Sequence, residues 1–361
     1  MKFMNINVLL EEAVKSKASD LHITVGVPPV LRVNGKLKYY NDIALTAHDT
    51  EDLTHQVLDE SQLKELDALG EWDLSFYIPG VARFRVNAYK QRGSYAMAIR
   101  VVSIDPPTLD ELGFPESLKE LAMKPRGLIL VTGPTGSGKS TTLAAMVDYI
   151  NRYRSCHIIT LEDPIEYLHK HNKSIVNQRE IGSDTKNFAN ALRAALREDP
   201  DVILVGEMRD QETISIAITA AETGHLVMST LHTMSADQTV DRIIDSFPAY
   251  QQPQIRTQLA AVIEGIIAQQ LIPLKNNQNR VAALEILLAN NAIRNLIREG
   301  RTHQIQTSIQ TGIKNGMRTM DYSLADLVRR NLITLESAME RAMDVEMLKQ
   351  HLRMFNIEES R

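Results

Sequence analysis

The chain has 361 residues, which suits two domains because single hydrophobic cores stop growing at about 300 residues. Its apolar fraction of 43% and charged fraction of 24% are those of ordinary soluble globular proteins, and they exclude a disordered or fibrous chain. A formal charge of −5, with no Lys/Arg run or basic stretch interleaved with aromatics, argues against a nucleic-acid partner.

Cysteine usage and apolar run length exclude two further classes. The single cysteine, Cys156, permits neither an internal disulfide nor a four-cysteine zinc site. A membrane span needs about 20 mostly apolar residues, but Glu11 and Glu12 interrupt the amino terminus, and Glu264 interrupts residues 259–274. We therefore expect a cytoplasmic protein without direct membrane insertion, which reaches the inner face of a membrane through a partner.

The first hundred residues are predicted to form a small α/β domain. Residues 9–20 have helical spacing, and strand-like runs follow at residues 21–26 and 28–40. In the second run, Asn34-Gly35 is a hairpin signal. A second, single helix is expected over residues 50–70.

Three antiparallel strands with tight turns are expected from residue 72 onwards. Residues 101–115 are predicted to be a linker, because Pro106, Pro107 and Pro115 cannot continue a helix or a strand. The small domain is therefore placed at residues 1–100.

The remainder, residues 116–361, has the pattern of an α/β domain with a parallel sheet. Four short apolar runs, each bounded by Gly or acidic residues, are separated by helical segments. They are residues 127–133, 157–163, 201–207 and 225–232. From about residue 290 the pattern is helical only, which indicates a carboxyl-terminal helical extension.

The sequence GPTGSGKS matches the Walker A pattern in full, between an apolar strand and a helix. Its glycines let backbone N–H groups surround phosphate oxygens, and the helix N-terminus favours negative charge. Lys139 is expected to reach the β and γ phosphates of ATP, and Ser140 to hold Mg²⁺. The predicted nucleotide-binding residues are Gly133, Pro134, Thr135, Gly136, Ser137, Gly138, Lys139, Ser140 and Thr141.

Three further residues end strands of the same predicted sheet. Glu162 lies with Asp163 at the carboxyl end of the second run, where a carboxylate can orient and deprotonate the attacking water. Glu207 follows Gly206, which replaces the usual strand-terminal Asp of Walker B, so we expect Glu207 to take the acidic role near Mg²⁺; the alternative is a strand cap. His232, at the end of the fourth run, suits a phosphate sensor, although a lone histidine is more often structural.

Hydrolysis also needs positive charge on the γ-phosphoryl group, often from an arginine finger of a neighbouring subunit. The strands of the small domain offer Arg83, Arg85, Arg92 and Arg100. We expect at least one of them to serve, with a solvated side chain as the alternative for each.

Together these segments resemble the secretion ATPases over nearly the whole chain. GPTGSGKST, LEDPIEY, VGEMRD and AAETGHLVMSTLHT occur in the order of that family, and SDLH with GVPPVLRVNG resembles the PAS-like domain of its pilus motors. The resemblance implies a PAS-like domain followed by a RecA-like ATPase domain. It also implies a homohexamer with ATP bound between the domains. By motif match Glu162 is the general base, Glu207 positions Mg²⁺ through water, and Arg83 and Arg100 are the arginine candidates.

Two features separate the family members. Assembly-type ATPases carry a longer amino-terminal region and a four-cysteine zinc motif, which are both lacking in this sequence, and AIRNLIRE at residues 292–299 is similar to the signature of retraction ATPases. The resemblance therefore implies an ATP-driven motor for type IV pilus retraction and twitching motility. An inner-membrane platform protein is the implied partner, and an accessory retraction ATPase is a further one. Pilus assembly, type II secretion, a non-catalytic accessory subunit and a nucleic-acid translocase are the alternatives.

Overall fold

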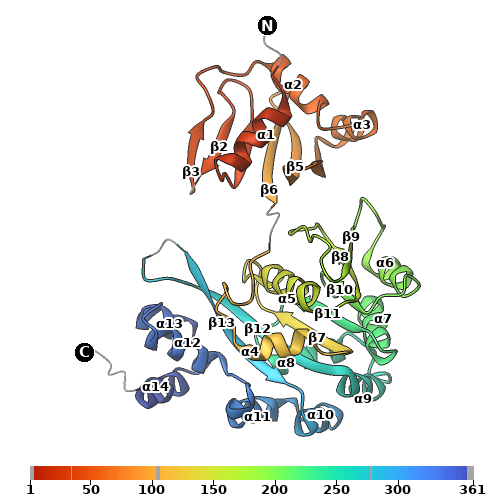
Figure 1. The fold of residues 1–361 in the computed structure, drawn as a ribbon, viewed down its shortest axis with the longest axis vertical. Helices are drawn as coiled ribbons and strands as arrows, with labels where there is room; N and C mark the ends of the chain where they lie inside the picture. Colours follow the sequence, from red (N-terminus) through yellow and green to blue (C-terminus); the bar gives the residue numbers. More distant parts are fainter. Residues whose placement is uncertain (1–3, 34, 103–105, 277–278, 356–361) are drawn as a thin grey trace. The chain divides into compact units, whose positions relative to one another are not determined.

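The computed structural model describes residues 4–33, 35–102, 106–276 and 279–355, which divide into two compact units (Figure 1). The first unit is Met1–Asp105 with Glu166–Leu168, and the second is Pro106–Ile165 with His169–Arg361. Both units are mixed α/β, which confirms the predicted fold class. Asn34 of the expected hairpin turn and residues 103–105 of the expected linker lie outside the described residues.

The first unit contains, in its described part, a six-stranded antiparallel sheet in the order β3-β2-β1-β6-β5-β4. One face of this sheet forms a hydrophobic core with the helices. The three strands expected from residue 72 onwards are confirmed as β4, β5 and β6. The elements are α1 (Ile6–Lys15), β1 (Asp20–Ile23), β2 (Val30–Val33), β3 (Lys36–Tyr39), α2 (Ala47–His55), α3 (Glu60–Leu69), β4 (Glu71–Ile78), β5 (Ala82–Gln91) and β6 (Ser94–Val102).

The single helix predicted over residues 50–70 is wrong, because α2 and α3 are separate helices. Between them, the Asp59 carboxylate accepts hydrogen bonds from the N–H groups of Ser61 and Gln62 at 2.9 Å each. In return, the Gln62 side chain accepts one from the Asp59 N–H. This capping box satisfies N–H groups at the start of a helix, so it favours a new helix at Glu60 over continuation of α2.

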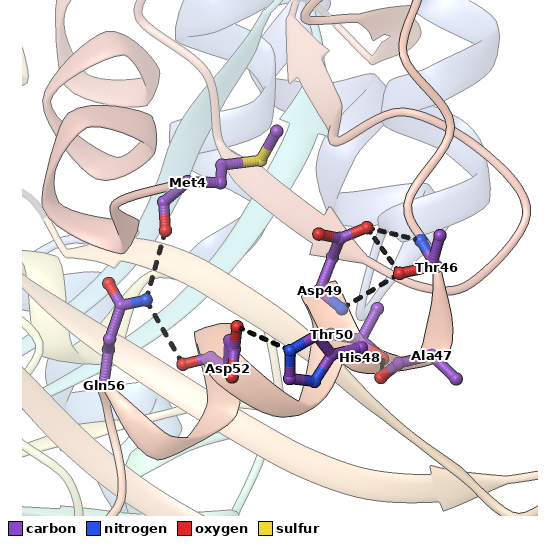
Figure 2. Close-up of polar contacts among 8 residues, drawn as sticks. All are labelled: Met4, Thr46, Ala47, His48, Asp49, Thr50, Asp52 and Gln56. Atoms are coloured by element: carbon purple, nitrogen blue, oxygen red, sulfur yellow. Dashed lines mark hydrogen bonds and ion pairs between the residues drawn. The ribbon is translucent and has the colours of Figure 1, made fainter. Parts of the chain in front are cut away.

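A second capping box starts α2 (Figure 2). The Asp49 N–H donates to Thr46 Oγ1 at 3.2 Å, and the Thr46 N–H donates to Asp49 Oδ2 at 2.8 Å. The bonds from the Thr46 hydroxyl and N–H hold the pKa of Asp49 below its usual value. At the other end of α2, Gln56 donates to the carbonyls of Met4 and Asp52 at 3.1 and 3.2 Å. These bonds connect α2 to the segment that precedes α1.

The described residues of the second unit form a seven-stranded sheet in the order β13-β12-β7-β11-β10-β8-β9. The strands from β12 to β9 are parallel, and β13 alone runs antiparallel to its neighbour. The four apolar runs are confirmed as parallel strands. The strands are β7 (Gly127–Thr132), β8 (His157–Glu162), β9 (Ile175–Glu180), β10 (Val202–Val205), β11 (Leu226–Leu231), β12 (Ile263–Pro273) and β13 (Arg280–Leu288).

Helices cover both faces of this sheet (Figure 1). One layer holds α4 and α5, the other α6 to α11, and α12 to α14 pack on the far end of the β12–β13 hairpin. Within the described ranges, no helix is both long and apolar enough to cross a membrane. The helices of this unit are α4 (Glu116–Ala122), α5 (Lys139–Tyr153), α6 (Phe188–Ala195), α7 (Gln211–Glu222), α8 (Ala236–Asp245), α9 (Gln252–Val262), α10 (Asn291–Arg298), α11 (Ile305–Thr311), α12 (Met320–Arg329), α13 (Leu335–Arg341) and α14 (Val345–Met354), with short 3-10 turns at Thr302–Gln304 and Ile313–Asn315.

Two features of this unit are absent from the sequence-based expectations. The apolar residues 259–274 change from helix to strand without a break, because α9 ends at Val262 and β12 begins at Ile263. In the segment expected to be a linker, Leu109 and Phe114 are buried in the core with α4 and α5. Residues 106–115 of that segment therefore belong to the second unit, whereas Val101 and Val102 belong to β6 of the first unit.

Glu285 of β13 is buried between the sheet and its helices. Its carboxylate accepts hydrogen bonds from the Ala236 N–H at 2.8 Å, at the start of α8, and from Gln306 of α11 at 3.1 Å. Burial raises the pKa of Glu285 from 4.5 to about 7, because these two bonds offset the desolvation of the charged form only in part. Glu285 is thus a buried acid that joins β13, α8 and α11.

The Glu285→Gln variant is expected to change how stability depends on pH. A carboxyl group with a raised pKa binds protons more tightly in the folded chain, so the free energy of unfolding falls as pH rises from about 4.5 to about 7. The full interval corresponds to about 3 kcal/mol. Denaturation midpoints measured at several pH values should show that the stability of the variant, relative to that of the wild type, increases as pH rises. Parallel profiles for the two proteins would contradict this account.

Candidate active site

The carboxyl ends of β7, β11, β10 and β8 meet at one edge of the large sheet, because these adjacent strands are parallel. The Walker A loop follows β7, and His232 follows β11. Glu207 lies two residues after β10, and Glu162 is the last residue of β8. Four segments that are distant in the sequence therefore reach the same edge.

The Walker A loop requires glycine at both of its ends. Gly133 has a φ of 140° and Gly138 a φ of 88°, in the region that L side chains rarely adopt. A β-carbon on Gly133 would also lie 2.3 Å from the carbonyl oxygen of Gln269, and one on Gly138 would lie 2.9 Å from Gln269 Nε2. Backbone conformation and close packing against β12 thus impose the same residue at these two positions.

Lys139 begins α5 and lies over the loop. Its ammonium group donates hydrogen bonds to the carbonyls of Gly133 at 2.9 Å and Pro134 at 3.1 Å, and the residue is 9% exposed. The N-cap is Gly138, which has no side chain to cap the first turn of α5. The ammonium group, the N–H donors of this turn and the helix dipole together fit the phosphates of a nucleotide.

The remaining loop residues differ in exposure. Pro134, Thr135 and Gly136 form the exposed part of the loop, whereas Ser137 is buried and Ser140 and Thr141 are half-buried on α5. The hydroxyl of Ser140 and the carboxylate of Glu207 are hard oxygen donors of the kind that Mg²⁺ prefers. The donor set therefore fits a magnesium ion.

Glu162 is held by its neighbours on the sheet. Its Oε1 accepts hydrogen bonds from the Thr160 hydroxyl at 2.6 Å and from Gln178 Nε2 at 3.2 Å. Gln178 lies on β9, directly beside Thr160 in the parallel pair, and its own Oε1 accepts from the His169 N–H at 2.8 Å. Both of these bonds fall on the same oxygen, so they restrain the rotation of the carboxylate at the strand end.

Glu207 is paired with two basic side chains. Its Oε1 lies 2.8 Å from Arg209 Nε and 2.9 Å from His232 Nε2. Burial raises the pKa of Glu207, but the hydrogen bond from Arg209 and the charges of His232 and Arg209 outweigh that effect, so the pKa lies below its usual value. Glu207 is accordingly an ionised carboxylate, and His232 is joined directly to it.

The predicted arginines Arg83 and Arg100 belong to the first unit and share one face of its sheet. Arg85 pairs with Arg100 across β5 and β6, and Arg83 lies two residues before Arg85, so all three are on the face opposite the core. Arg100 is largely exposed, with its Nε 3.1 Å from Asp20 Oδ1. Arg92 lies apart, in the β5–β6 turn with a φ of 50°.

Several residues of the site were not identified from the sequence. Arg209 follows Glu207 by two residues, so its proximity to that glutamate could have been expected. Gln178 and Thr160 lie on neighbouring strands, but β9 itself was not predicted. Gln269 donates to the carbonyl of Ser137, which is 132 residues earlier, and no local pattern indicates such a contact.

The helix formed by the AIRNLIRE segment is α10. Ile293 and Ile297 are fully buried and Leu296 is partly buried, which confirms the predicted apolar face. Arg294 donates to the carbonyls of Ala260 and Ala261 at 2.8 Å each, at the end of α9. The segment is therefore an integral part of the second unit.

Comparison with known proteins identifies the family. The model of the family Type II/IV secretion system protein matches residues 2–356. The type IV pilus retraction ATPase PilT of Pseudomonas aeruginosa is 50% identical over 339 residues, which is 94% of this chain and 98% of that protein. The type IV pilus ATPase PilU of the same organism is 41% identical over 339 residues, covering 94% and 89%.

The crystal structure of the pilus retraction motor PilT with bound ADP has a similar fold. Its TM-score is 0.89 at 51% identity, and the match covers 96% of this chain and 99% of that one. The family match and both similarities extend over nearly the whole chain. The chain therefore belongs to the Type II/IV secretion system protein family and is an ATPase.

Proposed function

We propose that this chain is the motor that powers type IV pilus retraction, and hence twitching motility. It works as a ring of six identical subunits that hydrolyse ATP at the cytoplasmic face of the inner membrane. The observation that carries this proposal is the 50% identity to PilT across nearly the full length of both proteins. An inner-membrane pilus platform protein is the proposed partner, and a PilU-like ATPase is a further one.

In this proposal the two units act as the moving domains; the second includes residues 106–115, which were expected to be part of a linker, as well as residues 116–361. The loop N–H groups and Lys139 hold the phosphates of ATP, and Ser140 with Glu207 hold Mg²⁺. Bound Mg²⁺ would neutralise charge on the phosphate oxygens. The bonds from Arg209 and His232 keep Glu207 ionised and oriented for that role.

Glu162 is the proposed general base. Thr160 and Gln178 hold its carboxylate at the strand end, on the same edge as the Walker A loop, so it can accept the proton of the attacking water. Arg83 and Arg100 are proposed to supply positive charge to the γ-phosphoryl group. His232, bonded to Glu207, would report the state of the phosphates to β11.

Three observations argue against an assembly ATPase and a non-catalytic subunit. The chain lacks the cysteines of the zinc motif of assembly-type ATPases, since it has only Cys156. Lys139, Glu162 and Glu207 are all present, and identity to PilT exceeds identity to PilU, 50% against 41%. A catalytic retraction motor therefore accounts for the chain better than an assembly ATPase or a non-catalytic accessory subunit.

Substitutions at the phosphate site should separate binding from hydrolysis. Lys139→Ala is expected to abolish ATP binding, because it removes the only side-chain cation of the Walker A motif. Glu162→Gln is expected to retain ATP binding but to lower kcat by about 10²- to 10⁴-fold, since the amide cannot accept the proton. Binding would be measured with a fluorescent ATP analogue and hydrolysis by phosphate release.

Glu212→Gln is the matched control. Glu212 lies on α7, pairs with Arg193 at the surface and is largely exposed. This variant should hydrolyse ATP at the wild-type rate. If Glu162→Gln were equally active, Glu162 would not be the base.

Glutamine substitutions in the first unit test the arginine proposal. Arg83→Gln and Arg100→Gln should each lower kcat at least about tenfold while ATP binding persists, because the lost charge acts on the transition state. Arg92→Gln, in the β5–β6 turn away from that face, serves as the control. Equal activity of all three variants would assign the positive charge elsewhere.

Disruption of the gene in its host tests the direction of the motor. Cells that lose twitching but keep abundant surface pili are expected, because pilin subunits would no longer return to the membrane. Plasmid-borne wild type should restore motility, and the Glu162→Gln chain should not. Cells without surface pili in electron micrographs would instead indicate a role in pilus assembly.

A further inference from the structure

Gln269 of β12 makes hydrogen bonds to two parts of the phosphate site. It is 2% exposed, and β12 lies directly beside β7, the strand that leads into the Walker A loop. Its Nε2 donates to the Ser137 carbonyl at 2.7 Å, and its Oε1 accepts from the Thr142 hydroxyl at 2.6 Å. We propose that Gln269 is a positioning residue that sets the shape of the phosphate-binding loop.

The chemistry of the two partners fixes the orientation of the amide. The carbonyl of Ser137 is only an acceptor, so it must face the NH₂ group of Gln269. The oxygen of Gln269 then faces Thr142, whose hydroxyl can donate to it. The amide thereby joins the middle of the loop to the first turns of α5, which no other type of uncharged side chain of this length can do.

Packing around the loop makes this position rigid. The backbone carbonyl of Gln269 lies so close to Gly133, and its Nε2 so close to Gly138, that neither glycine has room for a β-carbon. Both ends of the loop and Ser137 between them thus contact the same residue. The contact with Gly133 is made by the Gln269 backbone, so a change in the side chain acts on the loop through Ser137 and Gly138.

The loop binds phosphate through backbone N–H groups, which act only when their directions converge. Loss of the Gln269 amide would leave the Ser137 carbonyl without this donor, while the Thr142 hydroxyl would keep only its longer bond to the Gly138 carbonyl at 3.2 Å. The cost of the lost bonds favours a rearranged loop. Gln269 touches the loop but not Glu162 in any described contact. Its removal should therefore weaken nucleotide binding more than it slows the chemical step.

The test compares Gln269→Met and Gln269→Glu with a Gln270→Met control. Gln270 is the next residue of β12, is also buried at 6% exposure, and faces the opposite side of the strand. Full-length protein would be titrated with a fluorescent ADP, and KM for ATP and kcat would be measured separately. Thermal midpoints without nucleotide would report on folding.

Gln269→Met is expected to raise Kd for ADP and KM for ATP about tenfold, with a smaller change in kcat. Gln269→Glu should weaken binding at least as much, because a carboxylate oxygen would face the Ser137 carbonyl. Gln270→Met should bind within about twofold of wild type. Wild-type affinity in Gln269→Met, or an equal loss in Gln270→Met, would overturn the proposal.

A further variant guards against misfolding. If Gln269→Met does not fold, Thr142→Val removes the hydroxyl that donates to Gln269 at 2.6 Å and to the Gly138 carbonyl at 3.2 Å, with little change in shape, and it should raise Kd for ADP several-fold. Folded Thr142→Val with wild-type affinity would then overturn the proposal. The inference rests on the proposed ATP site: a wild-type chain that bound no nucleotide would refute that site itself, whereas the variants test Gln269 alone.

Discussion

In a parallel sheet that is covered by helices on both faces, the strands can carry few polar side chains away from their ends. β7 and β11 are buried at every position, and β10 likewise. The polar groups of this unit are therefore concentrated where the strands stop. Because β7, β11, β10 and β8 are adjacent and parallel, their carboxyl ends lie at one edge of the sheet. This alignment brings together the Walker A loop, His232, Glu207 and Glu162.

The β12–β13 hairpin brings large polar side chains into the interior of the sheet, whereas β8 and β11 bury only the small hydroxyls of Thr160, Ser229 and Thr230. Gln269 faces the layer that contains α5, whereas Glu285, which pairs with Ala268 across the hairpin, faces α8 and α11. A buried polar group is costly unless it is hydrogen-bonded, and each of these two has partners on the helix layer that it faces. The hairpin thus fixes helices on both sides of the sheet through specific bonds as well as apolar contact.

The sequence was sufficient for the parts of the structure in which a local pattern determines the outcome. The continuous apolar runs predicted β7, β8, β10 and β11, and GPTGSGKS predicted the turn from β7 into α5. It was insufficient where tertiary packing decides. The change from helix to strand at Ile263 is not predicted, because the apolar residues on both sides of it fit either structure and the only local signals are Glu264 and Gly265, where the pairing of β12 with β7 is irregular. The capping box that divides α2 from α3 is visible in the sequence, where Gln62 follows Asp59 by three residues. The bonds of Gln269 join residues more than 120 positions apart, so only the fold reveals them.

The contacts of α10 give a physical reason for the residues of the AIRNLIRE segment, which is similar to the signature of retraction ATPases. Ile293 and Ile297 fill the core, and Arg294 bonds to the last carbonyls of α9 and pairs with Glu264 of β12 at 2.7 Å. A cation at a helix carboxyl end is favoured both by the unpaired carbonyls and by the helix dipole. Contacts within the second unit therefore explain the residue types at Ile293, Arg294 and Ile297, and no partner protein is needed to explain them. On this helix a partner would have to contact the exposed positions, among them Asn295 and Arg298, so a change there would test recognition without disturbing the core.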